Sequence, residues 1–442
     1  MRPFLPTLGA LLLGLALLTP TPAQAVTASA GGFGEIRFSA QPGVDGTWWN
    51  LTERVRPRFQ AQLHERIAVA AEIEMLFVQG RNPRLEIQTL MEESDFGPLL
   101  ELAEVEWPTY ANEVLQIDSI ADVLSVERLY VDFYLPFMDL RVGRQALFWG
   151  SSMMINPTDP FPEFLLAEPW RQRAGTNAVR AIIPFNEDID FTAVFATNDI
   201  FTKMRAAGRL RLRLPFADLA LVAAFRQDDL DGLLGVDLRG ELGVGWWFEG
   251  SLHIQETIYE EFAVGVDYSF PVLDGLIVMA QYYRNGAGAG PKDEPTLVTG
   301  RLTNDLPPEL GEAFSGAADT ADADVADPKV FAPLLGGRDY LLLTVNQVFA
   351  PEVSLSFVAL QNLDDGTGFM IPSVTVSPTG WLQFALNAQI PYRLWGDGGE
   401  FKPDPDSLIV SQEIGPFNQL YEADFSGLLP DATITFWTRA SF

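Results

Sequence analysis

The sequence predicts an all-β protein: a closed antiparallel transmembrane β-barrel of about 18 strands, with short periplasmic turns and long extracellular loops. Three observations lead to this fold class. Apolar and polar residues alternate with a period of two along most of the chain. Short turns and longer connections follow one another in a regular order. After residue 25, no apolar run is long enough for a membrane-spanning helix, which needs about 20 residues.

The period-two pattern defines the strands that the barrel requires. In the last segment, Ile434, Phe436 and Phe442 lie on one face, and Thr435 and Trp437 lie on the other. The predicted strands are 33–40, 50–64, 67–78, 126–135, 139–148, 178–185, 189–196, 203–214, 217–226, 234–242, 246–254, 262–270, 276–284, 339–349, 353–361, 369–377, 381–390 and 431–442. The split at 243–245 and the strand that contains Pro372 are the weakest, so 16 strands is the alternative count.

The connections favour a membrane barrel over a soluble sandwich. Tight Pro-containing turns follow even-numbered strands, whereas the segments 79–125, 149–177, 285–338 and 391–430 follow odd-numbered ones. This separation of short turns from long loops is typical of outer-membrane barrels. Phe residues beside the turns fit a periplasmic aromatic girdle, with Trp149, Trp246 and Tyr282 as candidates for the outer girdle.

Composition excludes several classes of protein. The chain has 442 residues, 59 Asp and Glu against 29 Lys and Arg, a net charge of −30, 2 His and no Cys. Without Cys there is no disulfide framework, thiol nucleophile or zinc–thiolate site. The acidic balance argues against nucleic acid as a partner, because a nucleic-acid binder needs a basic surface.

The two ends of the chain carry expected targeting signals. Arg2, the apolar run 8–18 and the sequence 23–25 resemble a secretory signal peptide, so we expect residues 1–25 to be removed and 26–442 to form the barrel. The final strand, ending at Phe442, resembles the signal that the barrel assembly machinery recognises. The expected location is the cell outer membrane, reached through the periplasm, with membrane lipid and lipopolysaccharide as partners. The oligomeric state stays open.

Two basic stripes are predicted to face the lumen. The first is Arg54, Arg56 and Arg58. In a hairpin, the residue numbers of two directly opposed residues add up to a constant. For the turn near residue 65 this sum is about 130, which places Arg58 opposite Glu72 and Arg56 opposite Glu74. Much of the first stripe is therefore expected to be neutralised by the next strand.

The second stripe lies on the strand 203–214 and consists of Lys203, Arg205, Arg209, Arg211 and Arg213. Across the next turn Arg213 faces Asp218, and on the other side Asp190 is expected near Arg209. Lys203, Arg205 and Arg211 have no evident acidic neighbour on paper. The stripe therefore predicts anion selection by the wall of a wide channel, or pairing with a loop folded into the pore.

One motif carries a family resemblance. The residues 140–150, LRVGRQALFWG, and 156–161, NPTDPF, resemble the R-x-G-R-Q…W-G…N-P-x-D pattern of alginate-export-type porins and related porin-like barrels. The resemblance implies a barrel with an Arg-rich lumen for a polyanionic chain. Arg141 is predicted to face the lumen, and a bulge near Gly143 would also turn Arg144 inward.

The loop after this motif is a candidate constriction. It carries Asn156, Asp159, Arg171 and Arg173, and it either folds into the pore or remains an external loop. The acidic long loops are expected to serve solvation. Loop-bound Ca²⁺ is the alternative, although the spacing matches no EF-hand.

The predicted function is passive diffusion of small hydrophilic, anionic solutes through an outer-membrane channel. Selection would rest on size and electrostatics, with no cofactor and no catalysis. His64 and His253 are not part of any visible Ser, His and acid arrangement at one barrel end, so no enzyme is expected. Two alternatives stay open: a polysaccharide-export-type porin, and a non-conducting barrel that displays surface loops as an adhesin or scaffold.

Overall fold

The computed structural model describes residues 27–43, 46–81, 121–161, 173–197, 204–227, 232–255, 258–272, 275–288, 335–396, 398–402, 409–414, 419–424 and 432–442. Within these ranges, no helical segment combines the length and the apolar character that a transmembrane helix requires. The expected signal peptide lies outside the described residues.

Within these described ranges, twenty strands form two sheets. The strands of the first half of the chain are β1 (Thr27–Gly43), β2 (Gly46–His64), β3 (Ile67–Arg81), β4 (Ala121–Leu135), β5 (Met138–Gln145), β6 (Thr176–Pro184), β7 (Ile189–Thr197), β8 (Met204–Arg213), β9 (Ala217–Arg226) and β10 (Gly232–Glu241). Those of the second half are β11 (Gly245–Ile254), β12 (Ile258–Phe270), β13 (Leu276–Asn285), β14 (Asp339–Ala350), β15 (Val353–Asn362), β16 (Thr367–Thr379), β17 (Leu382–Arg393), β18 (Ile409–Ile414), β19 (Gln419–Asp424) and β20 (Thr433–Ser441).

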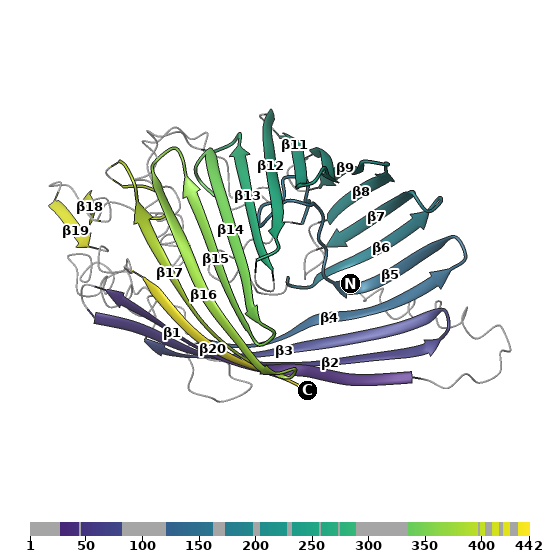
Figure 1. The fold of residues 1–442 in the computed structure, drawn as a ribbon, viewed down its shortest axis with the longest axis horizontal. Coiled ribbons are helices and arrows are strands. Elements are labelled where there is room, and N and C mark those ends of the chain that lie inside the picture. The colour runs from purple at the N-terminus through teal and green to yellow at the C-terminus, as the bar shows by residue number, and fades with distance from the viewer. Residues whose placement is uncertain are drawn as a thin grey trace.

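Eighteen strands close into one antiparallel barrel, as the sequence predicts. Strands β1 to β17 pair in chain order, and β20 lies between β17 and β1, where Figure 1 shows it in yellow. At this seam, Gly32 and Phe442 exchange two backbone hydrogen bonds of 2.9 and 3.0 Å. Because each strand pairs on both sides, the backbone polar groups of the wall have partners without water, which a membrane-spanning sheet needs.

The two faces of the wall differ in polarity. Exposed apolar side chains alternate along the strands on the outer face, for example Ile36, Phe38, Phe59, Leu129 and Phe436. The residues between them on the strands point inward and include the charged side chains described below. A wall that is apolar outside and polar inside is the pattern of a membrane barrel.

Several boundaries differ from the sequence prediction. Strand β1 is much longer than 33–40, and β4 begins at Ala121 rather than near residue 126. The long connection 391–430 contains a separate hairpin, β18–β19, that the period-two pattern did not reveal. Strand β5 ends at Gln145, and Trp149 is buried against Phe161 inside the barrel, so its assignment to the outer girdle was wrong.

Candidate functional site

A non-strand segment fills part of the lumen. Residues 146–161, here the inner segment, follow β5, and Figure 1 shows them as a blue coil inside the ring of strands. The carboxylate of Glu249 in β11 accepts the backbone N–H groups of Ser151, Ser152 and Thr158, at 2.7 Å for Ser152 and 3.4 Å for Thr158. One buried carboxylate therefore holds both halves of the inner segment against the wall.

Neighbouring strands extend this attachment. In β13, Gln281 accepts the Met153 N–H at 2.7 Å and donates to the Met153 carbonyl at 2.9 Å. In β10, Asp237 accepts a hydrogen bond from the Ser151 hydroxyl. The inner segment is thus held by side chains from three strands of the wall, β10, β11 and β13.

Apolar contacts complete the packing on both sides. Leu147, Trp149 and Phe161 join a buried cluster on the inner faces of β6 to β10, which includes Val194 and Leu233. A second cluster collects Met153, Met154 and Ile155 with the inner faces of β12 to β16, including Tyr283 and Leu342. These contacts place the inner segment on the β6–β16 side of the barrel.

The candidate constriction residues belong to this arrangement in part. Asn156 and Asp159 are buried, and the Asp159 N–H donates to the Asn156 carbonyl at 3.0 Å. Arg173 donates to the Asp159 carboxylate at 2.5 Å and to the Phe161 carbonyl at 3.0 Å, so it ties the two ends of the connection together. Arg171 lies outside the described residues.

The opposite side of the lumen carries a network of charges at the closure seam. We call it the seam network, and its members are Arg37, Arg54, Arg56, Arg58, Arg128, Arg439, Glu35, Glu72, Glu74 and Glu127. The carboxylate of Glu35 accepts hydrogen bonds from Arg37, Arg54 and Arg439 at 2.8, 3.2 and 2.6 Å. Each acid is shared among several guanidinium groups, which is how so many buried charges are compensated.

The predicted pairing of the first stripe is confirmed within this network. Arg58 lies directly opposite Glu72, and their side chains are 3.0 Å apart. Arg56 reaches Glu72, Glu74 at 3.7 Å and Glu127 at 3.4 Å. Among the described residues, the printed ion pairs of this network join six arginines to four glutamates.

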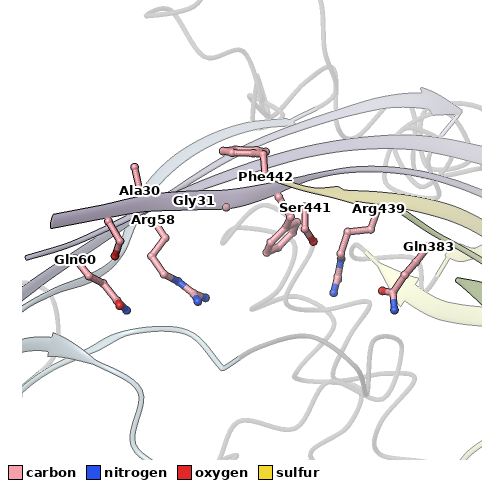
Figure 2. Close-up of a pocket in the computed structure, with 11 residues that line it drawn as sticks. Ala30, Gly31, Arg58, Gln60, Gln383, Arg439, Ser441 and Phe442 are labelled. Carbon is pink, nitrogen blue, oxygen red and sulfur yellow. The ribbon is translucent and has the colours of Figure 1, made fainter. Parts of the chain in front are cut away.

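A depression opens beside this network at the periplasmic end of the wall. This seam pocket has a volume of about 440 Å³. Figure 2 shows Arg58, Gln60, Arg439 and Gln383 pointing to the same side of the sheet within it. Most network side chains are nearly inaccessible, but the side chain of Arg58 is 45% exposed and that of Arg439 is 25% exposed.

The second stripe is neutralised by the wall more than the sequence predicted. Arg213 lies opposite Asp218 as expected. Asp190, however, lies opposite Arg211 rather than Arg209, and their side chains are 2.5 Å apart, so the expectation that Arg211 lacks an acidic neighbour was wrong. Arg209 approaches Asp237 at 3.5 Å.

Two further positions of this stripe need comment. Arg205 lies directly opposite Arg226, a buried arginine of β9 that sequence reasoning did not select. Lys203 lies outside the described residues, and β8 begins at the next residue, Met204.

The motif arginines on β5 face opposite sides of the wall. Arg141 faces the lumen and forms two hydrogen bonds with Asp132 of β4, at 2.6 and 2.9 Å. Arg144 lies opposite Leu129, whose side chain is 58% exposed on the outer face. The prediction that Arg144 lines the pore was therefore wrong, because the bulge lies in β4 at residue 127 and not in β5.

An arginine missed by the sequence reasoning lies beside Arg141. Arg180 of β6 is directly opposed to Arg141 and shares its inward face. The alternation of 178–185 could have revealed it, since Ala178 and Arg180 are two residues apart. Like charges in directly opposed positions repel each other.

The wall also contains a buried Ser, His and Glu group that the sequence did not make visible. Ser251 Oγ and the Glu261 carboxylate both approach Nε2 of His253, at 3.1 and 3.6 Å. In a catalytic triad the acid binds the imidazole nitrogen that does not face the nucleophile. This group therefore lacks triad geometry, and the stacking of His253 on Tyr259 at 4.6 Å indicates a packing role.

Glu400, in the loop that follows β17, is the centre of a group of hydrogen bonds that we call the Glu400 cage. The carboxylate of Glu400 accepts from Asn362 Nδ2 and the Gly336 N–H, both at 2.9 Å, and from the Tyr340 hydroxyl. Burial, assisted by the neighbouring Asp365 carboxylate, raises the pKa of Glu400 to about 7. Phe401 packs edge-on against Phe369, so the cage covers the upper part of the second apolar cluster.

Metal ligands were expected, if anywhere, in the acidic loops. Across the described ranges, no three His, Asp or Glu side chains are grouped as they would be around a metal ion. Most of the segments 79–125 and 285–338, on which the Ca²⁺ alternative depends, lie outside the described residues.

Comparisons with known proteins agree with the architecture. No protein-family model and no curated protein matches the sequence. Among solved structures, OccK11 (OpdR) of Pseudomonas aeruginosa has a TM-score of 0.52 at 8% identity, over 94% of this chain and 96% of that one. The outer membrane protein OprD of Pseudomonas aeruginosa has a TM-score of 0.50 at 7% identity, over 94% of both chains. The chain therefore shares the barrel fold of these proteins.

Proposed function

We propose that the protein is an outer-membrane channel for the passive diffusion of small hydrophilic solutes, with a preference for anions. The observation that carries this proposal is the division of the lumen into two sides. The inner segment packs on the β6–β16 side. The seam network lines β20 and β1 to β4, and two of its arginines, Arg58 and Arg439, keep partly exposed side chains. A solute that passes beside the inner segment would meet this basic wall.

The mechanism requires neither chemistry nor a cofactor. The inner segment limits the cross-section, and fixed guanidinium groups raise the local concentration of anions over that of cations. Export through the periplasm and insertion by the barrel assembly machinery, with Phe442 as the recognised end, belong to the same proposal. The apolar outer face supports contact with membrane lipid and lipopolysaccharide.

Two alternatives are less well supported. A polysaccharide-export channel for a long polyanion would need arginines that are free to bind it, whereas Glu35, Glu72 and Glu74 occupy much of the seam network. A non-conducting barrel is favoured by one observation, the apolar packing of the inner segment on both sides. The test below separates this alternative from the channel.

The test is single-channel recording of the refolded protein in a planar bilayer, with the reversal potential measured across a KCl gradient. Discrete conductance steps with a reversal potential of anionic sign are expected. Steps with cation preference would retain the channel and overturn its selectivity. A folded barrel that never conducts would overturn the channel and favour the surface-displaying protein.

A further inference from the structure

We infer that a neutral recess in the lumen wall is a binding site for small uncharged carbohydrates. This recess, here the amide recess, lies where β2, β1, β20 and β17 adjoin, toward the end of β20 that is opposite Phe442. Its polar side chains include Ser39, Gln41, Asn50, Asn387, Gln389 and Thr435. The inference goes beyond the proposed preference for anions, because it concerns a class of solute that carries no charge.

Polar side chains form one row across the four strands of the recess. Asn50 of β2 lies directly opposite Ser39 of β1, and Ser39 lies directly opposite Thr435 of β20. Thr435 lies in turn opposite Asn387 of β17. Neighbouring strands are about 5 Å apart, so hydrogen-bonding groups follow one another at short intervals along the row. A molecule that lies across these strands would therefore meet several of them together.

The row lies in a hollow of the wall with apolar edges. Ser39, Thr435 and Asn387 are buried residues, although they line a recess of about 200 Å³. Val78 of β3 and Ile371 of β16 line it on either side, next to β2 and β17. Polar groups in a fixed arrangement beside apolar side chains are the usual lining of a small-molecule site. They suit a molecule that has both hydroxyl groups and C–H faces.

Several amide groups of the recess have no partner within the described part of the chain. The hydroxyl groups of Ser39 and Thr435 are 2.9 Å apart and bond each other. The side chains of Asn50, Asn387 and Gln389 form no hydrogen bond to any described residue. Asn387 is only 4% exposed, and a polar group withdrawn from water is costly unless it is hydrogen-bonded. Its partner must come from a molecule that enters the recess.

The chemistry of the recess favours hydroxyl groups over carboxylates. Among its described lining residues only Arg37 is charged, and the carboxylate of Glu35 already accepts from this guanidinium at 2.8 Å. A carboxylate can only accept hydrogen bonds, so it would leave the amide oxygens of Asn50 and Asn387 without a donor. A hydroxyl group both donates and accepts. A molecule with several hydroxyl groups can therefore satisfy amide oxygens and amide hydrogens at the same time.

The experiment compares trehalose with tetraethylene glycol. Both compounds are uncharged, but trehalose carries hydroxyl groups on both rings, whereas the ether oxygens of tetraethylene glycol accept hydrogen bonds and cannot donate. Binding to the full chain is measured by saturation-transfer NMR titration in an amine-oxide detergent, which contains neither sugar nor ethylene glycol units. Trehalose is expected to bind about fivefold more tightly, because it can donate to the amide oxygens. Equal or weaker binding of trehalose would overturn the inference.

Two variants locate the site. Asn387→Leu removes an amide that no described residue binds, so it breaks no hydrogen bond of the wall. It is expected to weaken trehalose binding about fivefold and to leave tetraethylene glycol unchanged. Thr52→Val removes one hydroxyl group of the recess at constant volume and is expected to weaken trehalose binding about threefold. Full affinity for trehalose in both variants would show that the recess is not the site.

The matched control is Asn346→Leu on β14. Asn346 shares the inner face of β14 with Leu342 and Thr344, and its side chain also forms no hydrogen bond to a described residue. It lies outside the amide recess, so trehalose affinity should not change. If Asn346→Leu weakened trehalose binding as much as Asn387→Leu, the binding would not be specific to the recess and the inference would be wrong.

Binding in detergent does not require conduction, so this inference and the proposed channel fail separately. A barrel that binds trehalose through Asn387 but never conducts would overturn the channel and keep the site. A barrel that conducts but binds trehalose no better than tetraethylene glycol would keep the channel and overturn the site.

Discussion

Gln281 and Met153 are joined by two reciprocal hydrogen bonds, one in each direction between the amide side chain on β13 and the backbone of the inner segment. Gln281 also accepts from the indole N–H of Trp247 at 2.8 Å, which fixes its orientation. Together with Glu249, it holds the inner segment against the wall.

Removing the Glu249 carboxylate is therefore expected to release the inner segment. Glu249→Ala leaves three backbone N–H groups without their acceptor, at a cost of roughly 1–3 kcal/mol for each that stays unpaired. Single-channel recordings should show larger and noisier conductance steps than those of the wild type. Glu241→Ala removes an exposed acid from the adjacent strand and serves as the control. Unchanged conductance in Glu249→Ala would contradict the constricting role of the segment.

Glu35 is expected to determine the stability of the closure seam. Glu35→Gln removes the charge that three arginines share, and breaking a buried ion pair in this way costs about 3–5 kcal/mol. The measurement is the temperature at which the folded band is lost in heat-modifiable electrophoresis. Asp218→Asn is the matched comparison, because Asp218 is 57% exposed and its contact with Arg213 is worth about 0–1 kcal/mol. Equal melting of the two variants would argue against a stabilising network.

Gly143 is expected to tolerate no side chain. Its φ is +125°, and a Cβ there would overlap the Leu129 carbonyl oxygen of the neighbouring strand. Gly143→Ala should therefore lower the unfolding free energy by more than about 2 kcal/mol through backbone strain and overlap. Gly380→Ala is the control, since a Cβ at that turn position meets no atom within 4 Å. Chemical denaturation of both variants in detergent gives the comparison.

The cage around Glu400 is expected to loosen as pH rises. Its pKa of about 7 lies above the ordinary value of 4.5, so the docked loop favours the protonated acid. The stabilisation is complete below about pH 4.5 and is lost as pH rises through about 7. Hydrogen exchange at the Gly336 and Phe401 amides, corrected for intrinsic pH dependence, should accelerate over this range. Glu400→Gln should abolish the acceleration, and exchange that is independent of pH in the wild type would disprove the coupling.

Local pairing could be predicted from the sequence, because a tight turn sets the register of the hairpin that it joins. The index sum of 130 correctly placed Arg58 opposite Glu72, and the Pro215 turn correctly placed Arg213 opposite Asp218. Between β7 and β8 the connection is longer and imposes no register. The sequence therefore predicted Arg209 as the partner of Asp190, whereas the structure places Asp190 opposite Arg211, two residues further along β8.

The sequence left open whether the loop after β5 folds into the pore, because the contacts that decide this join distant segments. Glu249 and Ser152 are 97 residues apart, and no periodicity links them. The orientation of Arg144 depended on the location of a bulge, which β4 contains and β5 does not. Composition and alternation thus predict the strands of the wall. The contacts that hold the inner segment in the lumen became visible only in the structure.

The seam has a consequence for the kinetics of folding. The Glu35 and Arg439 side chains bind each other across 404 positions of sequence, whereas β1 to β17 pair with their immediate successors. Hairpins between successive strands close short loops and form quickly, but a pairing of high contact order forms slowly. We expect the joining of β20 to β1 to limit the rate of barrel formation. A change that weakens the seam contacts should then slow folding in proportion to the share of those contacts that is formed in the transition state.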